Sequence, residues 1–356
     1  MQQDMHYNGV YVLARAAGLN KDAAHIVANA SQFVDDSFGM DFVDFDDSRQ
    51  IQPVVTAHAV LDLVENDKRS DQRRVWLPFH FLPACTGTDF QNKIVCGKNS
   101  DVAKTMIAEV VRLVTGGFPL EVVGIAAHVY ADTFSHYGFS GYSSDLNSVD
   151  QDSIDLKVDD QKIHDYIEDK AETYWDKIRQ NVTGNVAELG SMSLGHSGVD
   201  TYPDRPYLRW SFQYDDGRFS GPRDNRETFL EACEALHGFF SQIVAARPEY
   251  ADPAGQIPFR DIAERVKAVL AKEADMEGRC AAWNDAAHTG ALFAAKVGEP
   301  VPDYDGEDWK SLMEDASALN DMSLNDVPAY RFFQGAEVLR SFILRVLLPR
   351  HGVFAI

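Results

Sequence analysis

The chain has 356 residues, of which 45% are hydrophobic and 25% charged, which is typical of a globular protein with one large core or a core plus an appendage. Its 33 Lys and Arg residues against 55 Asp and Glu residues give a net charge of −22. This charge repels nucleic acid and anionic membranes unless a local basic patch overrides it, so a polyanionic substrate is disfavoured.

The N-terminus lacks the basic and apolar regions of a secretory signal, and no apolar run is long enough for a transmembrane segment. We therefore expect a cytoplasmic protein as synthesised, with export by a signal-independent route as the alternative. The four cysteines have no C-x-x-C spacing, which argues against a thiolate zinc site and predicts free thiols: Cys85, Cys96, Cys233 and Cys280.

Two helices are predicted at the start of the chain. The first spans residues 6–17, and the second, capped by Asn20, spans residues 21–34. The second helix delivers Asp35 and Asp36 at its C-terminal end, where the helix dipole disfavours negative charge. Carboxylates at this end of a helix suggest a compensating cation nearby.

A histidine follows within an apolar segment. Residues 54–65 fit either a short helix or a strand and contain His58. Residues 75–83 form an apolar run bracketed by prolines, which we expect to hold the backbone extended. This segment would present His80 from a rigid support.

The next two helices contain the most informative motif. Residues 101–115 form a predicted amphipathic helix, and two glycines separate it from the helix that follows. There, His128, Asp132 and His136 recur every four residues, so their side chains stack along one helix face. Imidazole and carboxylate are the ligands that Zn²⁺ binds where thiolates are absent, and one carboxylate can bridge two ions. The spacing therefore predicts a metal-binding face.

The middle of the chain is more polar. Residues 143–160 are predicted to form an acidic surface loop, and residues 161–180 a polar helix. Residues 194–210 are rich in Gly and Pro, which indicates a loop, and this loop could project His196, Asp200 and Asp204 towards a site.

The remainder of the chain is predicted to contain four helices, over residues 227–246, 259–274, 277–297 and 327–347. No strand alternation of any length is found, so the predicted fold class is all-α, a multi-helix bundle. We expect residues 1–250 to form the catalytic domain. Residues 251–356 would form a helical extension packed on it, or the two would make one continuous domain.

The candidate ligands occur in a definite order along the chain: His6, Asp35, His80, His128, Asp132, His136, His196 and Asp200. This ordered set of motifs resembles the zinc-dependent phospholipase C / S1-P1 nuclease superfamily. It is most similar to the branch that contains the glycosylphosphatidylinositol phospholipase D catalytic domain and related bacterial proteins of unassigned function. The resemblance covers roughly residues 4–210 as short motifs.

The resemblance implies an all-α fold with up to three zinc ions in one cleft. The first ion would be surrounded by four ligands: Asp35, His80, His128 and Asp132. Asp35 would also be the candidate catalytic general base.

The second ion would have three ligands: His136, His196 and Asp200. His6 would join the third ion, with Asp132 as the bridge. Secreted members of the superfamily supply an N-terminal Trp to this ion, and this chain has none. The third ion would then be bound differently, through Asp4, or not at all, so two to three zinc ions are expected.

The implied chemistry is phosphodiester hydrolysis, in which metal-activated hydroxide attacks phosphorus. The expected enzyme is phospholipase C-like and acts on a phospholipid headgroup, with at most transient contact with a membrane surface. An S1/P1-like nuclease is the alternative with the same chemistry, although the net charge makes nucleic acid a disfavoured partner. A metal-stabilised, non-catalytic interaction module is the alternative from another class.

A second histidine competes for the last ligand position. His164 with Asp165 is the adjacent pair of an HD-type phosphohydrolase, and His164 with Glu168 makes the H-x-x-x-E of the secreted bacterial phospholipases. Because this pair lies in a lysine-flanked polar helix, we predict a solvated face and choose His196 as the ligand.

Overall fold

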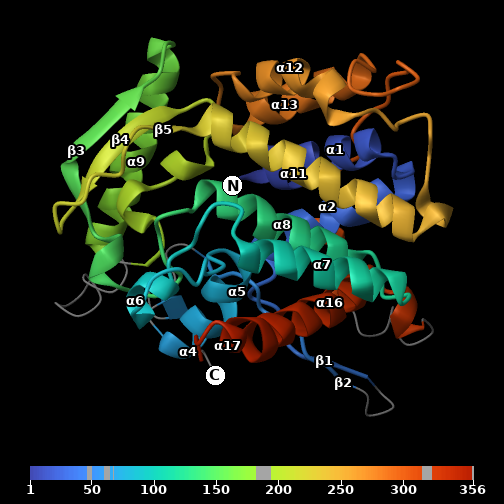
Figure 1. Ribbon diagram of the computed structural model, residues 1–356, viewed down its shortest axis with the longest axis horizontal. Helices are drawn as coiled ribbons and strands as arrows, with labels where there is room; N and C mark the ends of the chain where they lie inside the picture. The colour runs from blue at the N-terminus through green and yellow to red at the C-terminus, as the bar shows by residue number, and fades with distance from the viewer. Residues whose placement is uncertain (46–49, 60–64, 67, 182–193, 315–322, 355–356) are drawn as a thin grey trace.

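Helix α8 (Glu121–Ser135) lies at the centre of the computed structural model, with helices packed around it (Figure 1). The structure describes residues 1–45, 50–59, 65–66, 68–181, 194–314 and 323–354. It is predominantly helical, which confirms the predicted fold class. No helix in these described ranges combines the length and apolarity that crossing a membrane requires.

The N-terminal helices agree closely with the sequence pattern. A π-helical segment, Asp4–Gly9, leads directly into α1 (Val10–Ala17). The side chain of Asn20 accepts a 2.9 Å hydrogen bond from the backbone N–H of Ala23 and so caps α2 (Lys21–Asp36). Helix α2 is two residues longer than predicted, so the two aspartates lie within its last turn.

Helix α8 is buried along its whole length. It packs against α2, α7 (Asp101–Thr115), α11 (Asn225–Ala246) and α16 (Pro328–Phe342). Gly124 makes the close approach to α2 possible, because a Cβ at this position would lie 2.2 Å from the carbonyl oxygen of Val27. This contact brings the metal-binding face of α8 next to the end of α2.

The segment that carries His80 is helical, so the prediction of an extended backbone was wrong. Helix α4 (Arg69–Asp71), the π-helical segment Gln72–Trp76 and α5 (Leu77–Phe79) follow one another without a break. Pro78 lies within this continuous helical run, directly after the π-helical segment, where the regular helical hydrogen bonding is already interrupted, so its missing N–H is tolerated. His80 directly follows the helix.

The structure also contains strands that the sequence did not predict. The segment expected to be a loop forms β3 (Val149–Lys157), which pairs antiparallel with β4 (Arg209–Tyr214), and β4 pairs with β5 (Arg223–Asp224). Strands β1 (Val43–Asp44) and β2 (Gln50–Ile51) form a separate pair. The register shifts within β3, and most of its residues are partly or fully exposed, so the strand shows no clear apolar alternation.

The helices after residue 250 lie against the same core as α1, α2 and α8. They are α12 (Phe259–Leu270), α13 (Met276–His288), α14 (Gly306–Glu314), α16, the π-helical segment Ile343–Leu347 and α17 (Leu348–Arg350). Helix α13 is shorter than predicted, and α14 was not predicted. The ring of Phe33 in α2 packs edge-on against Phe332 in α16, with centroids 4.9 Å apart.

Among the described residues, the remaining helices are α6 (Phe90–Lys93), the long α9 (Gln161–Asn181) and five 3₁₀ segments: Asp145–Asn147, Ser197–Val199, Tyr202–Asp204, Pro248–Tyr250 and Leu324–Asp326. Helix α9 and the three-stranded sheet share a second, smaller apolar cluster. Figure 1 shows this sheet and α9 on one side of the helical core.

One buried carboxyl group in the core has no strong partner. Glu121, the first residue of α8, is only 1% exposed, and the nearest guanidinium nitrogen of Arg331 is 3.8 Å away. Burial raises the pKa of the Glu121 carboxyl to about 7, against 4.5 in the unfolded chain. The unfolded chain therefore loses this proton first, and the contribution of Glu121 to stability falls as the pH rises from about 4.5 to 7.

We predict that the free energy of unfolding of Glu121→Gln rises, relative to that of the wild type, as the pH increases from 4.5 to 7. Between pH 4 and pH 8 this difference in unfolding free energy should change by roughly 3 kcal/mol in favour of the variant, because one pKa unit corresponds to about 1.4 kcal/mol. Urea denaturation of both proteins across this range measures the difference. A difference that does not change with pH would contradict the ionisation of a buried carboxyl group.

Candidate metal centre

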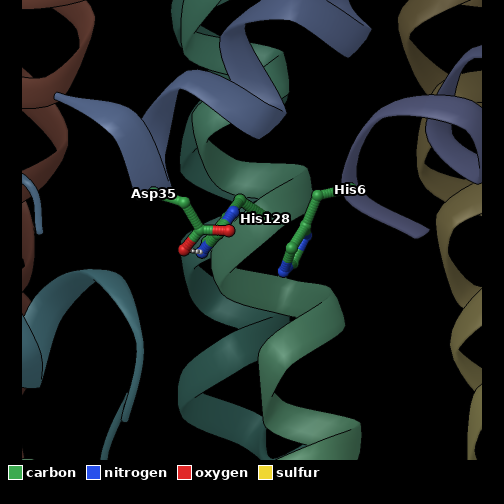
Figure 2. A group of neighbouring side chains, drawn as sticks. All are labelled: His6, Asp35 and His128. Atoms are coloured by element: carbon green, nitrogen blue, oxygen red, sulfur yellow. Dashed lines mark ion pairs between the residues drawn. The ribbon is translucent and has the colours of Figure 1, made fainter. Parts of the chain in front are cut away.

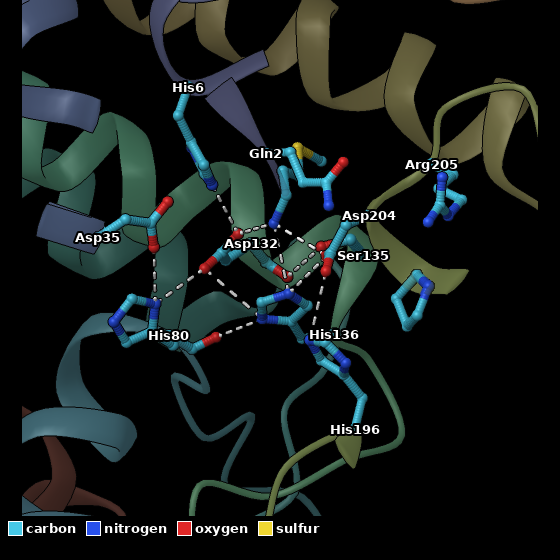
Figure 3. A network of polar contacts seen from close by, with 12 residues as sticks. Gln2, His6, Asp35, His80, Asp132, Ser135, His136, His196, Asp204 and Arg205 are labelled. Carbon is cyan, nitrogen blue, oxygen red and sulfur yellow. Dashed lines mark hydrogen bonds and ion pairs between the residues drawn. The ribbon is translucent and has the colours of Figure 1, made fainter. Parts of the chain in front are cut away.

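The structure brings together seven of the eight predicted ligands, which come from five separate segments: His6, Asp35, His80, His128, Asp132, His136 and His196. Figure 2 shows His128, and Figure 3 shows the other six. All of them except Asp35 and His196 are less than 5% exposed. A buried charge without a partner costs free energy, so the carboxylates of this cluster need positive groups close to them.

Asp132 lies at the middle of the cluster. Its Oδ2 atom is 3.2 Å from Nε2 of His128, 3.5 Å from Nδ1 of His80 and 3.5 Å from Nδ1 of His136. No described residue donates a hydrogen bond to this buried oxygen. An orphaned buried carboxylate oxygen surrounded by imidazoles is typical of a metal-binding group.

The hydrogen bonds of His80 and His128 define which ring nitrogen carries the proton. Nδ1 of His128 is 2.9 Å from the carbonyl oxygen of Ser31, and Nε2 of His80 is 2.9 Å from that of Thr56. A carbonyl oxygen can only accept, so both of these nitrogens donate an N–H. The two remaining nitrogens then face each other at 3.3 Å with lone pairs only. Such an arrangement needs a cation or a proton between them.

A metal ion fits this first group of atoms. Nδ1 of His80 and Nε2 of His128 each lie near two carboxylate oxygens, Oδ1 of Asp35 and Oδ2 of Asp132. These four nitrogen-to-oxygen distances are between 3.2 and 3.8 Å. A tetrahedral zinc ion holds its ligand atoms about 3.4 Å apart, given bonds of about 2.0–2.1 Å. Figure 2 shows Asp35 and His128 with His6 on the same side of α8. The residues form two overlapping groups of three that could each hold an ion: His80 with His128 and Asp132, and His6 with Asp35 and His128.

A second group repeats this pattern. Nδ1 of His136 donates to the carbonyl oxygen of His80 at 2.9 Å, and Nδ1 of His196 donates to that of Asp200 at 2.7 Å. Nε2 of His136 lies within hydrogen-bonding distance, 3.1 Å, of one carboxylate oxygen of Asp204, and Nε2 of His196 lies 3.6 Å from the other. Backbone carbonyls thus orient four imidazoles, as they do for histidines that bind metals.

His6 lies above the first group. Its ring stacks on His128 with centroids 3.8 Å apart, and its Nε2 is 3.2 Å from Oδ1 of Asp132. Neither ring nitrogen makes a hydrogen bond of good geometry to a described residue. The backbone nitrogen of Met1 also enters the cluster, 2.7 Å from Asp132 and 3.0 Å from Asp204.

A buried ion pair holds the segment that carries His6. Nε of Arg279, in α13, donates to Asp4 at 2.9 Å, and both side chains are 2% exposed or less. Asp4, an alternative ligand in the sequence analysis, is therefore bound to Arg279. Residues after position 250 thus help to position the N-terminal part of the site.

The protonation of the cluster suits metal binding. Burial by itself would raise the pKa of Asp132, but His136 and the other neighbouring positive groups hold it well below its usual range. Burial lowers the pKa of His6 well below its usual range, and that of His196 to about 4. Burial also disfavours a charged His80, but Asp132 and Asp35 raise its pKa overall, so a proton competes for this position.

The prediction that Asp200 is a ligand differs from the structure, which places Asp204 beside His136 and His196. Asp200 has a φ of +46°, and its contact with His196 is made by the backbone carbonyl. Its carboxylate accepts a hydrogen bond from the Thr201 hydroxyl. The H-x-x-x-D spacing assumes a helical repeat, whereas this loop turns sharply at Asp200 and brings the next aspartate into the site.

Other acidic and histidine residues lie outside these groups. Asp36 accepts hydrogen bonds from Gln32 and from the hydroxyl of Tyr304. His164 lies with Asp165 and Glu168 on α9, where both acids are at least 60% exposed. That second candidate cluster is separate from the centre, in line with the solvated face expected for it.

The centre opens into a cavity of about 410 Å³. One wall carries donor atoms of both groups, and four aromatic residues contribute to the rest: Phe38, Trp76, Phe81 and Tyr174. His58 and Asp200 also reach this cavity. None of the described residues that line it is Lys or Arg.

The fold and the site define a mostly helical protein with a buried cluster of imidazoles and carboxylates at one cavity. The chain belongs to DUF6765, a family of unknown function whose model matches residues 1–347. No curated protein and no solved structure matches this chain.

We predict that Asp204→Asn lowers the metal content by about one ion per chain, whereas Asp200→Asn leaves it unchanged. Asp204 places both carboxylate oxygens against the histidines, while Asp200 orients His196 through its backbone, which the substitution preserves. Metal analysis by mass spectrometry after dialysis compares the two variants. A larger loss for Asp200→Asn would restore the ligand assignment predicted from the sequence.

Proposed function

We propose that this protein is a zinc-dependent phosphodiester hydrolase, with phospholipase C-like action on a phospholipid headgroup. The observation that carries the proposal is the pair of ring nitrogens of His80 and His128 that point away from the backbone carbonyls and face each other at 3.3 Å, beside Asp35 and Asp132. The resemblance of the ordered ligand set to the zinc-dependent phospholipase C / S1-P1 nuclease superfamily supports the same conclusion.

Two groups of residues would hold the ions: Asp35, His80, His128 and Asp132 in one, and His136, His196 and Asp204 in the other. His6 and the second oxygen of Asp132 lie where a third ion would complete the set. When bound, zinc ions supply an activated water and neutralise charge on phosphoryl oxygens. Donors of this type, imidazole and carboxylate without thiolate, suit zinc.

The protein's own groups would orient the reaction. The side chain of Asp35 is 32% exposed and borders the cavity, so it can accept a proton from the attacking water. Asp132 contacts His128 in the first ligand group and His136 in the second, so it would fix the distance between the two groups. The aromatic walls would exclude bulk water from the phosphodiester.

The cavity favours a neutral or cationic headgroup. Its described lining contains four aspartates and no Lys or Arg, and aromatic rings attract quaternary ammonium groups. A polynucleotide would bring several further phosphates towards this acidic lining. These features favour the phospholipase over the S1/P1-like nuclease. The third hypothesis, a non-catalytic module, would use the same ions for stability alone.

We predict that the zinc-loaded protein hydrolyses p-nitrophenylphosphocholine, that a chelator abolishes the activity and that zinc restores it. Asp35→Asn should lower kcat/KM about 100-fold or more, as expected for loss of a general base and ligand. The adjacent Asp36→Asn is the matched control and should change it by no more than a few-fold. Release of p-nitrophenol measures each rate.

The alternatives give different outcomes. Protein of verified zinc content that hydrolyses neither this ester nor bis(p-nitrophenyl) phosphate would support the non-catalytic module. Single-stranded DNA cleaved faster than the phosphocholine ester would support the nuclease.

A further inference from the structure

Basic residues gather in two stretches of this acidic chain. Residues 340–354 contain Arg340, Arg345 and Arg350 and no acidic residue, and residues 68–74 contain four basic residues and one acidic residue. The structure brings the two stretches together. Phe354 of the first stretch lines the same cavity as Arg69 and Arg73 of the second.

A third segment joins the same surface. Nζ of Lys93, at the end of α6, donates a 3.0 Å hydrogen bond to the carbonyl oxygen of His351. Figure 1 shows α4, α6 and α17 gathered at one corner of the molecule beside the C-terminus. We call this surface the basic face and define it by six residues: Arg69, Arg73, Arg74, Lys93, Arg345 and Arg350. Asp71, Asp89 and Asp145 also lie in these segments or in the cavity beside them, so the local balance remains positive.

The basic face contains a cavity of its own, with a volume of about 570 Å³. Arg69 and Arg73 line it together with Ser144 and two phenylalanines, Phe90 and Phe354. Asp145 is the one carboxylate among the described residues of this lining. Guanidinium groups and hydroxyls around a hollow are suited to a phosphate group.

Apolar side chains project from the same surface. Phe354 is 69% exposed, Phe90 is 49% exposed and Val346, next to Arg345, is 37% exposed. Exposed apolar groups among basic residues are typical of proteins that bind at the interface of an anionic membrane. There the apolar groups enter the acyl boundary while the cations meet lipid phosphates.

We propose that the basic face binds an anionic phospholipid surface. Each cation near such a surface strengthens binding about fivefold, and the attraction acts over roughly the Debye length, about 8 Å at physiological salt. The remaining acidic surface is therefore screened from the membrane. Nucleic acid is the other polyanion that carries such charges, and an oligonucleotide is therefore included in the test.

The segment of residues 66–76 connects the basic face to the candidate metal centre. Asn66 and Trp76 line the cavity at the metal centre, and their side chains are hydrogen-bonded to each other at 3.1 Å. Arg69 and Arg73, between them in sequence, line the cavity of the basic face. Lipid binding is measured without hydrolysis, so the inference is tested separately from the proposed enzymatic activity.

The test is cosedimentation of the full-length protein with vesicles of phosphatidylcholine, either pure or containing phosphatidylglycerol. Binding is expected only with phosphatidylglycerol, and 0.5 M NaCl should weaken it strongly. The triple variant Arg69→Glu, Arg345→Glu and Arg350→Glu should bind about 100-fold more weakly or worse. Phe354→Ser should also weaken binding.

A matched control reverses the same number of charges elsewhere. Arg260→Glu, Lys267→Glu and Lys272→Glu alter three exposed cations on or beside α12, outside the basic face. This control should retain most of the binding. Equal loss in both triple variants, equal binding to the two vesicle types, or tighter binding to a single-stranded oligonucleotide would overturn the proposal.

Discussion

The structure depends on one electrostatic constraint, the meeting of unprotonated imidazole nitrogens in the buried space between α2 and α8. Once His80 and His128 have donated their N–H groups to backbone carbonyls, their other nitrogens face each other and Asp132 with no donor between them. In a protein interior such an arrangement is costly unless a cation fills it. The cluster could therefore hold a positive ion.

The surrounding fold maintains this arrangement from several directions. Gly124 lets α8 approach α2 closely enough for His128 to reach the carbonyl of Ser31. Gly195, in the left-handed region with φ of +56°, lies so close to Phe81 that a Cβ would overlap its ring, and this places His196 against His136. Because the donors come from segments far apart in sequence, metal binding energy would contribute directly to the stability of the fold.

The sequence predicted the main helices and the ligand-bearing face of α8. It did not predict the strands, the π-helical segment or the choice of aspartate in the loop, and each of these has a physical reason. The four-residue spacing on α8 specified one helix face, and the helix of residues 101–115 was predicted with its observed bounds. Asp200 was chosen over Asp204 as the ligand because a loop has no fixed periodicity, so spacing could not distinguish the two aspartates. Strand β3 was missed because its stability comes from pairing with β4, which is distant in sequence. The π-helical segment before His80 was missed because Pro78 was interpreted as a helix breaker, although it lies inside a helical run, directly after a π-helical segment.

Crystallographic anomalous scattering at the zinc absorption edge, on protein grown with zinc, tests the central claim most directly. The account predicts one peak between Asp35, His80, His128 and Asp132, and another between His136, His196 and Asp204, each about 2 Å from the unprotonated nitrogens. Absence of both peaks, with water or a shared proton between His80 and His128, would contradict it.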